Sequence, residues 1–70
     1  MTSYRVEGCL GVSVGTAKTI SDASVLVLKQ LPISEAGLTN LAKRLAAGSV
    51  GGQVRVEYGG TGCTVYLEKD

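Results

Sequence analysis

The chain has 70 residues, of which 44% are hydrophobic and 19% charged, a composition of folded globular domains and not of disordered tails. Seven basic and six acidic residues give a net charge of +1, which argues against a dedicated duplex-DNA binder with Lys and Arg gathered on one face. The length predicts a single domain, residues 1–70, that buries only about 60% of its unfolded surface. Because domains this small are often stabilised by oligomerisation, we expect a homodimer.

The sequence gives no sign of secretion or membrane insertion. Its first residues lack the charged segment and apolar core of a signal peptide, and the longest apolar run, residues 25–28, is too short to cross a bilayer. We therefore expect a cytoplasmic protein with no membrane partner. In that compartment Cys9 and Cys63 are expected as free thiols.

Residues 4–14 have apolar side chains at even positions and mostly polar ones at odd positions. This period of two predicts one strand whose even face, including Val12 and Val14, points toward a core. Gly8 and Gly11 mark places where the strand can bend or bulge. Residues 15–23 contain turn formers without a period, and they predict a loop.

Residues 24–31 contain four consecutive apolar residues, and periodicity does not separate a central strand from a short buried helix in such a run. A helix would have Asp22 as its N-cap and would end at Pro32. Only about nine residues fit between these signals, and two of them are β-branched. We expect a strand, with the helix as the alternative.

Residues 34–47 show the apolar stripe of an amphipathic helix, and Ser34 is a suitable N-cap. Glu35 stands in the positive first turn, and Gly48 is placed to end the helix. The stripe consists of Leu38, Leu41, Ala42, Leu45 and Ala46.

Residues 53–58 and 63–68 alternate between apolar and polar side chains on either side of a glycine-rich turn, and they predict a β-hairpin. A two-residue loop at 60–61, or a four-residue loop at 59–62, keeps all the apolar side chains on one face. In this register position 58 pairs with 63, 56 with 65 and 54 with 67.

The same register places Arg55 opposite Tyr66 and Glu57 opposite Thr64 on the other face. The predicted fold is α+β with the order ββαββ, or βααββ if residues 24–31 are helical. One antiparallel sheet then carries one long amphipathic helix on one face.

The glycine-rich stretch GVSVGTAKT at residues 11–19 resembles a phosphate-binding loop, but the spacing between its last Gly and its Lys does not match that motif. In that motif the Lys directly follows the last Gly, whereas two residues separate Gly15 from Lys18 here. The glycine clusters at 48–52 and 59–62 follow a helix and join two strands, so they are interpreted as a helix end and a turn.

The parts of an active site are also missing from the sequence. There is no His, which removes the commonest general base and most zinc sites, and the acidic residues show no paired spacing. Cys9 has no imidazole partner, and Cys63 falls on the predicted core face. We therefore expect no enzyme activity, no cofactor and no metal.

The remaining candidate is the sheet face that the helix leaves open. Arg and Tyr are enriched at binding hot spots, so this face is a candidate partner-binding surface. Its candidate residues are Arg5, Glu7, Arg55, Glu57 and Tyr66. The leading hypothesis is a non-catalytic protein-binding module, a regulator or inhibitor that acts through the open sheet face or an edge strand. The ββαββ outline occurs among small regulators and inhibitors of phages and mobile elements, an analogy of fold alone.

Two alternatives remain open at this point. A small nucleic-acid-binding protein would use Lys18, Lys29, Lys43 and Arg44 on phosphates, with Tyr66 stacked on a base. Three of these residues, Lys18, Lys43 and Arg44, form a candidate basic rim. A self-assembling structural subunit would instead use edge pairing itself as its function.

Overall fold

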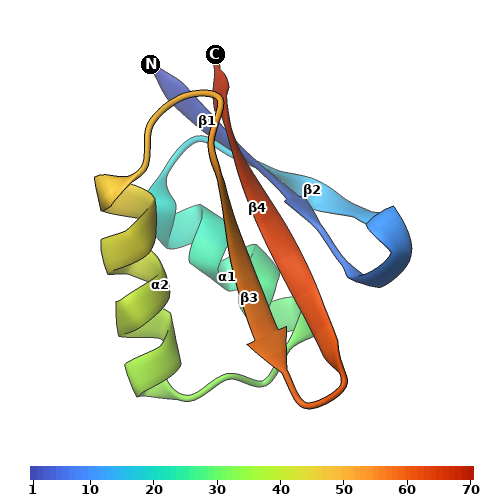
Figure 1. Cartoon of the computed structure of the whole chain (residues 1–70). Helices are drawn as coiled ribbons and strands as arrows, with labels where there is room; N and C mark the ends of the chain where they lie inside the picture. The colour runs from blue at the N-terminus through green and yellow to red at the C-terminus, as the bar shows by residue number, and fades with distance from the viewer.

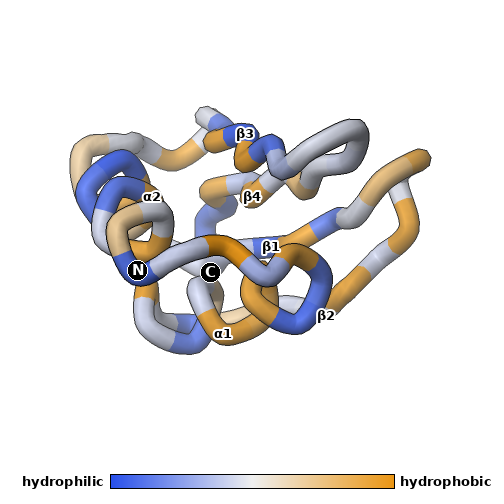
Figure 2. Tube along the Cα trace, turned by 90° about the horizontal axis from the view of Figure 1, so that it is seen from below, coloured by the Kyte–Doolittle hydropathy of each residue, from blue (hydrophilic) through white to orange (hydrophobic).

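The backbone forms one antiparallel sheet of four strands, with two helices packed on one of its faces (Figure 1, Figure 2). The computed structural model describes residues 1–70. The elements in chain order are β1 (Thr2–Glu7), the 3-10 turn η1 (Cys9–Gly11), β2 (Ser13–Ala17), α1 (Ile20–Gln30), α2 (Glu35–Ala47), β3 (Gln53–Tyr58) and β4 (Thr61–Lys69). The strand order is β2-β1-β4-β3. The predicted α+β class with one antiparallel sheet is thus confirmed, and the observed order ββααββ contains one helix more than the prediction.

The single strand predicted over residues 4–14 is wrong, because the chain reverses within it. β1 ends at Glu7, η1 turns the chain, and β2 returns antiparallel to β1. Leu10 and Gly11 make the turn with φ angles of 64° and 74°, in the left-handed region. Val12, predicted to point inward, is 65% exposed. The single strand was predicted because the alternation of apolar residues in the sequence continues through this turn.

Residues 20–30 form helix α1, so the predicted loop at 15–23 and the favoured strand at 24–31 are wrong and the helical alternative is right. The N-cap is Thr19 and not Asp22: the Thr19 hydroxyl accepts a hydrogen bond from the Asp22 backbone N–H at 3.1 Å. Ala23 and Val27, four residues apart, are the buried face of the helix. Burial of this face against the sheet outweighs the modest helix propensity of valine.

Helix α2 agrees with its prediction almost residue by residue. The Ser34 hydroxyl accepts from the Gly37 backbone N–H at 3.2 Å, and the helix ends at Ala47 before Gly48. Leu41 and Leu45 are its buried residues. Neither helix has the length and apolar character that a membrane span needs.

The β3–β4 hairpin has the predicted parity but a different register. Position 58 pairs with 61, 56 with 63 and 54 with 65, so the predicted pairs are shifted by two residues. The loop is Gly59-Gly60, in which Gly59 has a left-handed φ of 61° that suits glycine. Because a shift of two preserves the face of each side chain, Val54, Val56, Cys63, Val65 and Leu67 are still buried.

The core lies between the helices and one face of the sheet. The core side chains of β1, β3 and β4 come from alternate positions of each strand and pack with those of both helices, and β2 adds Ala17. Its largest fully buried side chains are Val6, Val27, Leu31, Leu41, Leu45, Cys63 and Val65. The opposite face of the sheet carries no helix (Figure 1).

The hairpin has no room for a side chain at Gly62, whereas it has room for one at Gly60. A Cβ at Gly62 would stand 2.7 Å from the Val56 carbonyl oxygen, whereas one at Gly60 would meet nothing within 4 Å. We expect Gly62→Ala to lower the free energy of unfolding by roughly 1–3 kcal/mol because the strands must move apart. Gly60→Ala should leave it nearly unchanged. Urea denaturation of both variants measures the difference, and equal midpoints would contradict this packing.

Candidate functional site

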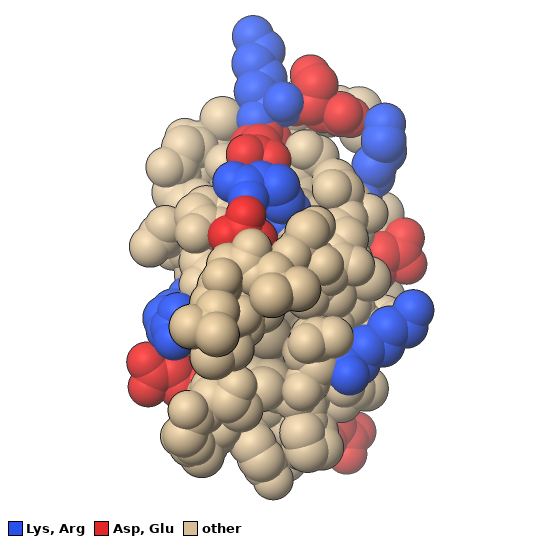
Figure 3. All heavy atoms as spheres, turned by 90° about the vertical axis from the view of Figure 1, so that its right-hand side faces the viewer, with Lys and Arg blue, Asp and Glu red and all other residues tan.

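The open face of the sheet gathers the side chains that alternate with the buried ones. Arg5 and Glu7 project from β1, Arg55 and Glu57 from β3, and Tyr66 from β4. All five partner-binding residues predicted from the sequence therefore lie on this face. We call it the open sheet face. Figure 3 shows basic and acidic groups interleaved on this side of the molecule, with a broad uncharged region beside them.

Arg5 is the centre of the charged part of the open sheet face. It stands directly opposite Tyr66 across the β1–β4 pair, and its guanidinium carbon lies 4.3 Å from the centroid of the Tyr66 ring. This is the geometry of a cation–π contact. The guanidinium group thus lies over one face of the tyrosine ring.

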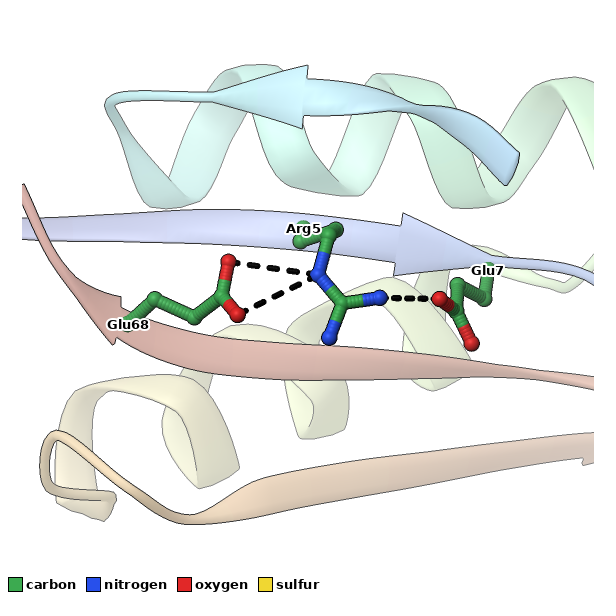
Figure 4. Close-up of polar contacts among 3 residues, drawn as sticks. All are labelled: Arg5, Glu7 and Glu68. Atoms are coloured by element: carbon green, nitrogen blue, oxygen red, sulfur yellow. Dashed lines mark hydrogen bonds and ion pairs between the residues drawn. The ribbon is translucent and has the colours of Figure 1, made fainter. Parts of the chain in front are cut away.

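Two carboxylates hold Arg5 in this position (Figure 4). The Arg5 Nε atom donates to both carboxylate oxygens of Glu68 at 3.2 Å, and an Nη1 hydrogen bond reaches Glu7. The hydrogen bond to Glu68, together with the charges of Glu68 and Glu7, raises the pKa of the Arg5 guanidinium above its ordinary value. Glu68 was not among the predicted site residues, although its position on β4 places it on this face.

A second arginine group lies on the β3 side. The Arg55 Nε atom is 3.3 Å from a carboxylate oxygen of Glu57, and an Arg55 Nη1 atom donates to the Thr64 hydroxyl at 3.3 Å. Arg55 is opposite Thr64 and not, as predicted, opposite Tyr66; Tyr66 faces Gln53 instead. The two-residue shift of the hairpin register causes this difference.

Both hairpin tips border the charged group at one end of the sheet. Since Glu7 of β1 pairs with Thr64 of β4, the β1–β2 turn and the β3–β4 turn lie at the same end. Residues 8–17 and 58–67 contain no charged side chain. The exposed apolar residues of these tips are Leu10, Val12 and Tyr58. The prediction placed Val12 and Tyr58 in the core; the absence of charge in both segments was the available signal for an apolar surface.

The candidate basic rim does not form one patch. Lys18 follows β2 and pairs with Asp70 at 3.4 Å. Arg44 on α2 donates to the Arg55 backbone carbonyl of β3 at 3.1 Å. Since β2 and β3 are opposite edges of the sheet, these two cations are on opposite sides of the molecule. Lys43 and Lys29 are exposed on α2 and α1.

Two grooves flank the sheet on its helical side. One, of about 520 Å³, lies between β2 and α1, and a smaller one of about 150 Å³ lies between α2 and β3. No cluster of three or more His, Cys, Asp or Glu side chains is placed to hold a metal ion. The larger groove is lined by Thr16, Ala17, Lys18, Asp22, Val25 and Leu26.

No protein-family model matches the chain, and no curated protein or solved structure shows significant similarity to it. Residue roles cannot be transferred from a relative. The functional inference therefore rests on the surfaces described above.

The two cysteines are free thiols in opposite environments: Cys9 is exposed in η1 and Cys63 is buried in the core. We expect iodoacetamide to modify Cys9 rapidly in the native protein and Cys63 only after denaturation. Mass spectrometry of the alkylated peptides measures both rates, with Cys9→Ser as the control that leaves Cys63 alone. Rapid native labelling of Cys63 would refute the buried placement.

The burial of Cys63 also makes the free energy of unfolding depend on pH. Desolvation raises the pKa of the Cys63 thiol, although the Arg55 charge acts in the opposite direction. Above about pH 8.5 the thiol ionises in the unfolded chain but keeps its proton in the folded one, so its contribution to stability falls as pH rises. The advantage of the wild type over Cys63→Ala in urea unfolding should be constant below this pH and shrink above it. A constant difference up to about pH 10 would be inconsistent with the raised pKa.

Proposed function

We propose that this chain is a non-catalytic protein-binding module, a regulator or inhibitor whose contact surface is the open sheet face centred on Arg5 and Tyr66. The observation that carries the proposal is the arginine lying over the tyrosine ring and held there by Glu68 and Glu7. Arginine and tyrosine are among the residue types that dominate binding energy at protein interfaces.

The arrangement is pre-organised for binding. Immobilising a free side chain on association costs roughly 0.5–1.5 kcal/mol, and Arg5 is already fixed by its neighbours before a partner arrives. Its Nη2 atom makes no hydrogen bond within the chain. That nitrogen is free to donate to a carbonyl or carboxylate of the partner.

The composition of the surface favours a protein over a nucleic acid. Both arginines of the open sheet face are paired with carboxylates, so they contribute little positive potential for phosphates. Leu10, Val12 and Tyr58 add apolar area at the adjoining hairpin tips. A polar centre beside an apolar border is suited to a protein surface, and the mixed charges select the partner that carries complementary ones.

The proposal is tested by affinity capture followed by measurement with the purified partner. The bait is the wild-type chain, the Arg5→Ala, Tyr66→Ala double variant, or the Lys43→Ala control, whose side chain is exposed on α2. Since a hot-spot residue contributes at least about 2 kcal/mol, the double variant should raise Kd at least about 30-fold, and the control should not change it. Retained affinity in the double variant would exclude the open sheet face as the contact.

A further inference from the structure

The two edges of the sheet are unequally protected. On β3, the charged residues Arg55 and Glu57 stand along the edge strand, and Arg44 of α2 donates to the Arg55 carbonyl. β2, residues Ser13–Ala17, pairs only with β1 and contains no charged residue. Proteins prevent edge pairing with charges, covering side chains and β-bulges, among other devices. β2 lacks the first two, and its one irregularity is a shift of its register with β1 between Ser13 and Gly15.

Helix α1 runs beside this unprotected edge and is part of the same surface. A Cβ at Gly15, the middle residue of β2, would lie 3.3 Å from the Leu26 side chain near the middle of α1. The groove of about 520 Å³ lies next to this close approach, between the end of β2 and α1. Val25, which lines the groove, is 50% exposed. The edge strand is therefore next to a recess that is lined by both apolar and charged side chains.

The outer stripe of α1 is self-complementary in charge. Asp22, Val25, Leu26 and Lys29 follow the spacing i, i+3, i+4, i+7, which is one side of a helix. An acid stands at one end of this stripe and a base at the other. Two such helices placed antiparallel and centred between Val25 and Leu26 bring Asp22 of each copy opposite Lys29 of the other.

We propose that two copies of the chain associate along β2, so that their four-stranded sheets join into one continuous antiparallel sheet. A two-fold axis at Gly15 pairs Ser13 of one copy with Ala17 of the other. Because Gly15 contacts Leu26, the same axis passes close to the middle of α1. A single axis thus satisfies both the strand register and the charge pairing. This self-complementarity identifies the occupant of the groove as a second copy.

This surface is separate from the open sheet face, so the dimer and the proposed partner contact are compatible. An axis perpendicular to the joined sheet leaves all four helices on one side. Both open sheet faces then lie on the other side, and loss of the dimer does not by itself abolish the Arg5–Tyr66 contact.

Sedimentation equilibrium from about 1 μM to about 1 mM tests the association, and we expect the wild type to be dimeric in the upper part of this range. Val25→Glu places two carboxylates near the axis and should leave a monomer. Val50→Glu is the matched control, since Val50 is also 50% exposed but lies between α2 and β3. A wild type that is monomeric at about 1 mM overturns the proposal and leaves the edge for an extended segment of another protein. A dimer that persists in Val25→Glu overturns it as well.

Charge reversal tests the register. Asp22→Lys and Lys29→Asp should each weaken the dimer by at least about tenfold, because each change replaces two attractive pairs by repulsive ones. The two residues are about 10 Å apart along their own helix, so their pairing must be between copies. An equimolar mixture of the two single variants should form a heterodimer, and the double variant should regain the wild-type Kd. Failure of both to recover would overturn the register, and circular dichroism confirms that each variant is folded.

Discussion

The structure depends on burial of only one face of a four-stranded sheet. Alternate side chains of β1, β3 and β4 pack against α1 and α2, and together they form the core. With 70 residues, the chain supplies two helices and no third layer. The other face of the sheet is therefore left without a helix, and the open sheet face and the unprotected edge at β2 both result from this small number of elements.

The pairing of the two central strands, β1 and β4, determines which side chains lie next to one another on the open sheet face. It sets Arg5 opposite Tyr66 and brings Glu68 within hydrogen-bonding distance of the guanidinium. Each arginine on this face is paired with a carboxylate, so the two ion pairs add no net charge to the surface. The two surfaces have distinct chemistry. The open sheet face has polar side chains with an apolar border, whereas the β2 edge has unpaired backbone groups beside a recess of mixed lining.

Local signals predicted the elements well from residue 34 onward, but the elements before it were largely misassigned. Helix α2 was evident from its stripe and its Ser34 cap, and hairpin parity identified the buried side of β3 and β4. The register was missed because Gly59-Gly60 and the longer loops preserve the same alternation. Residues 24–31 were ambiguous because an unbroken apolar run has no period. Both Arg5 and Tyr66 were predicted on the correct face of the sheet. Their contact could not be predicted, because it requires a pairing between strands at opposite ends of the sequence.

That long-range pairing also affects how the chain folds as it is synthesised. Arg5 and Glu68 are 63 residues apart, and β4 is the last element to be made. Until β4 leaves the ribosome, β1 lacks its central neighbour and the helices lack much of the sheet on which they pack. Local helix and hairpin formation is fast, but closure of the sheet must await the synthesis of β4. The sheet is therefore completed only after β4 has been made, and until then the apolar side chains of the earlier elements lack part of their packing.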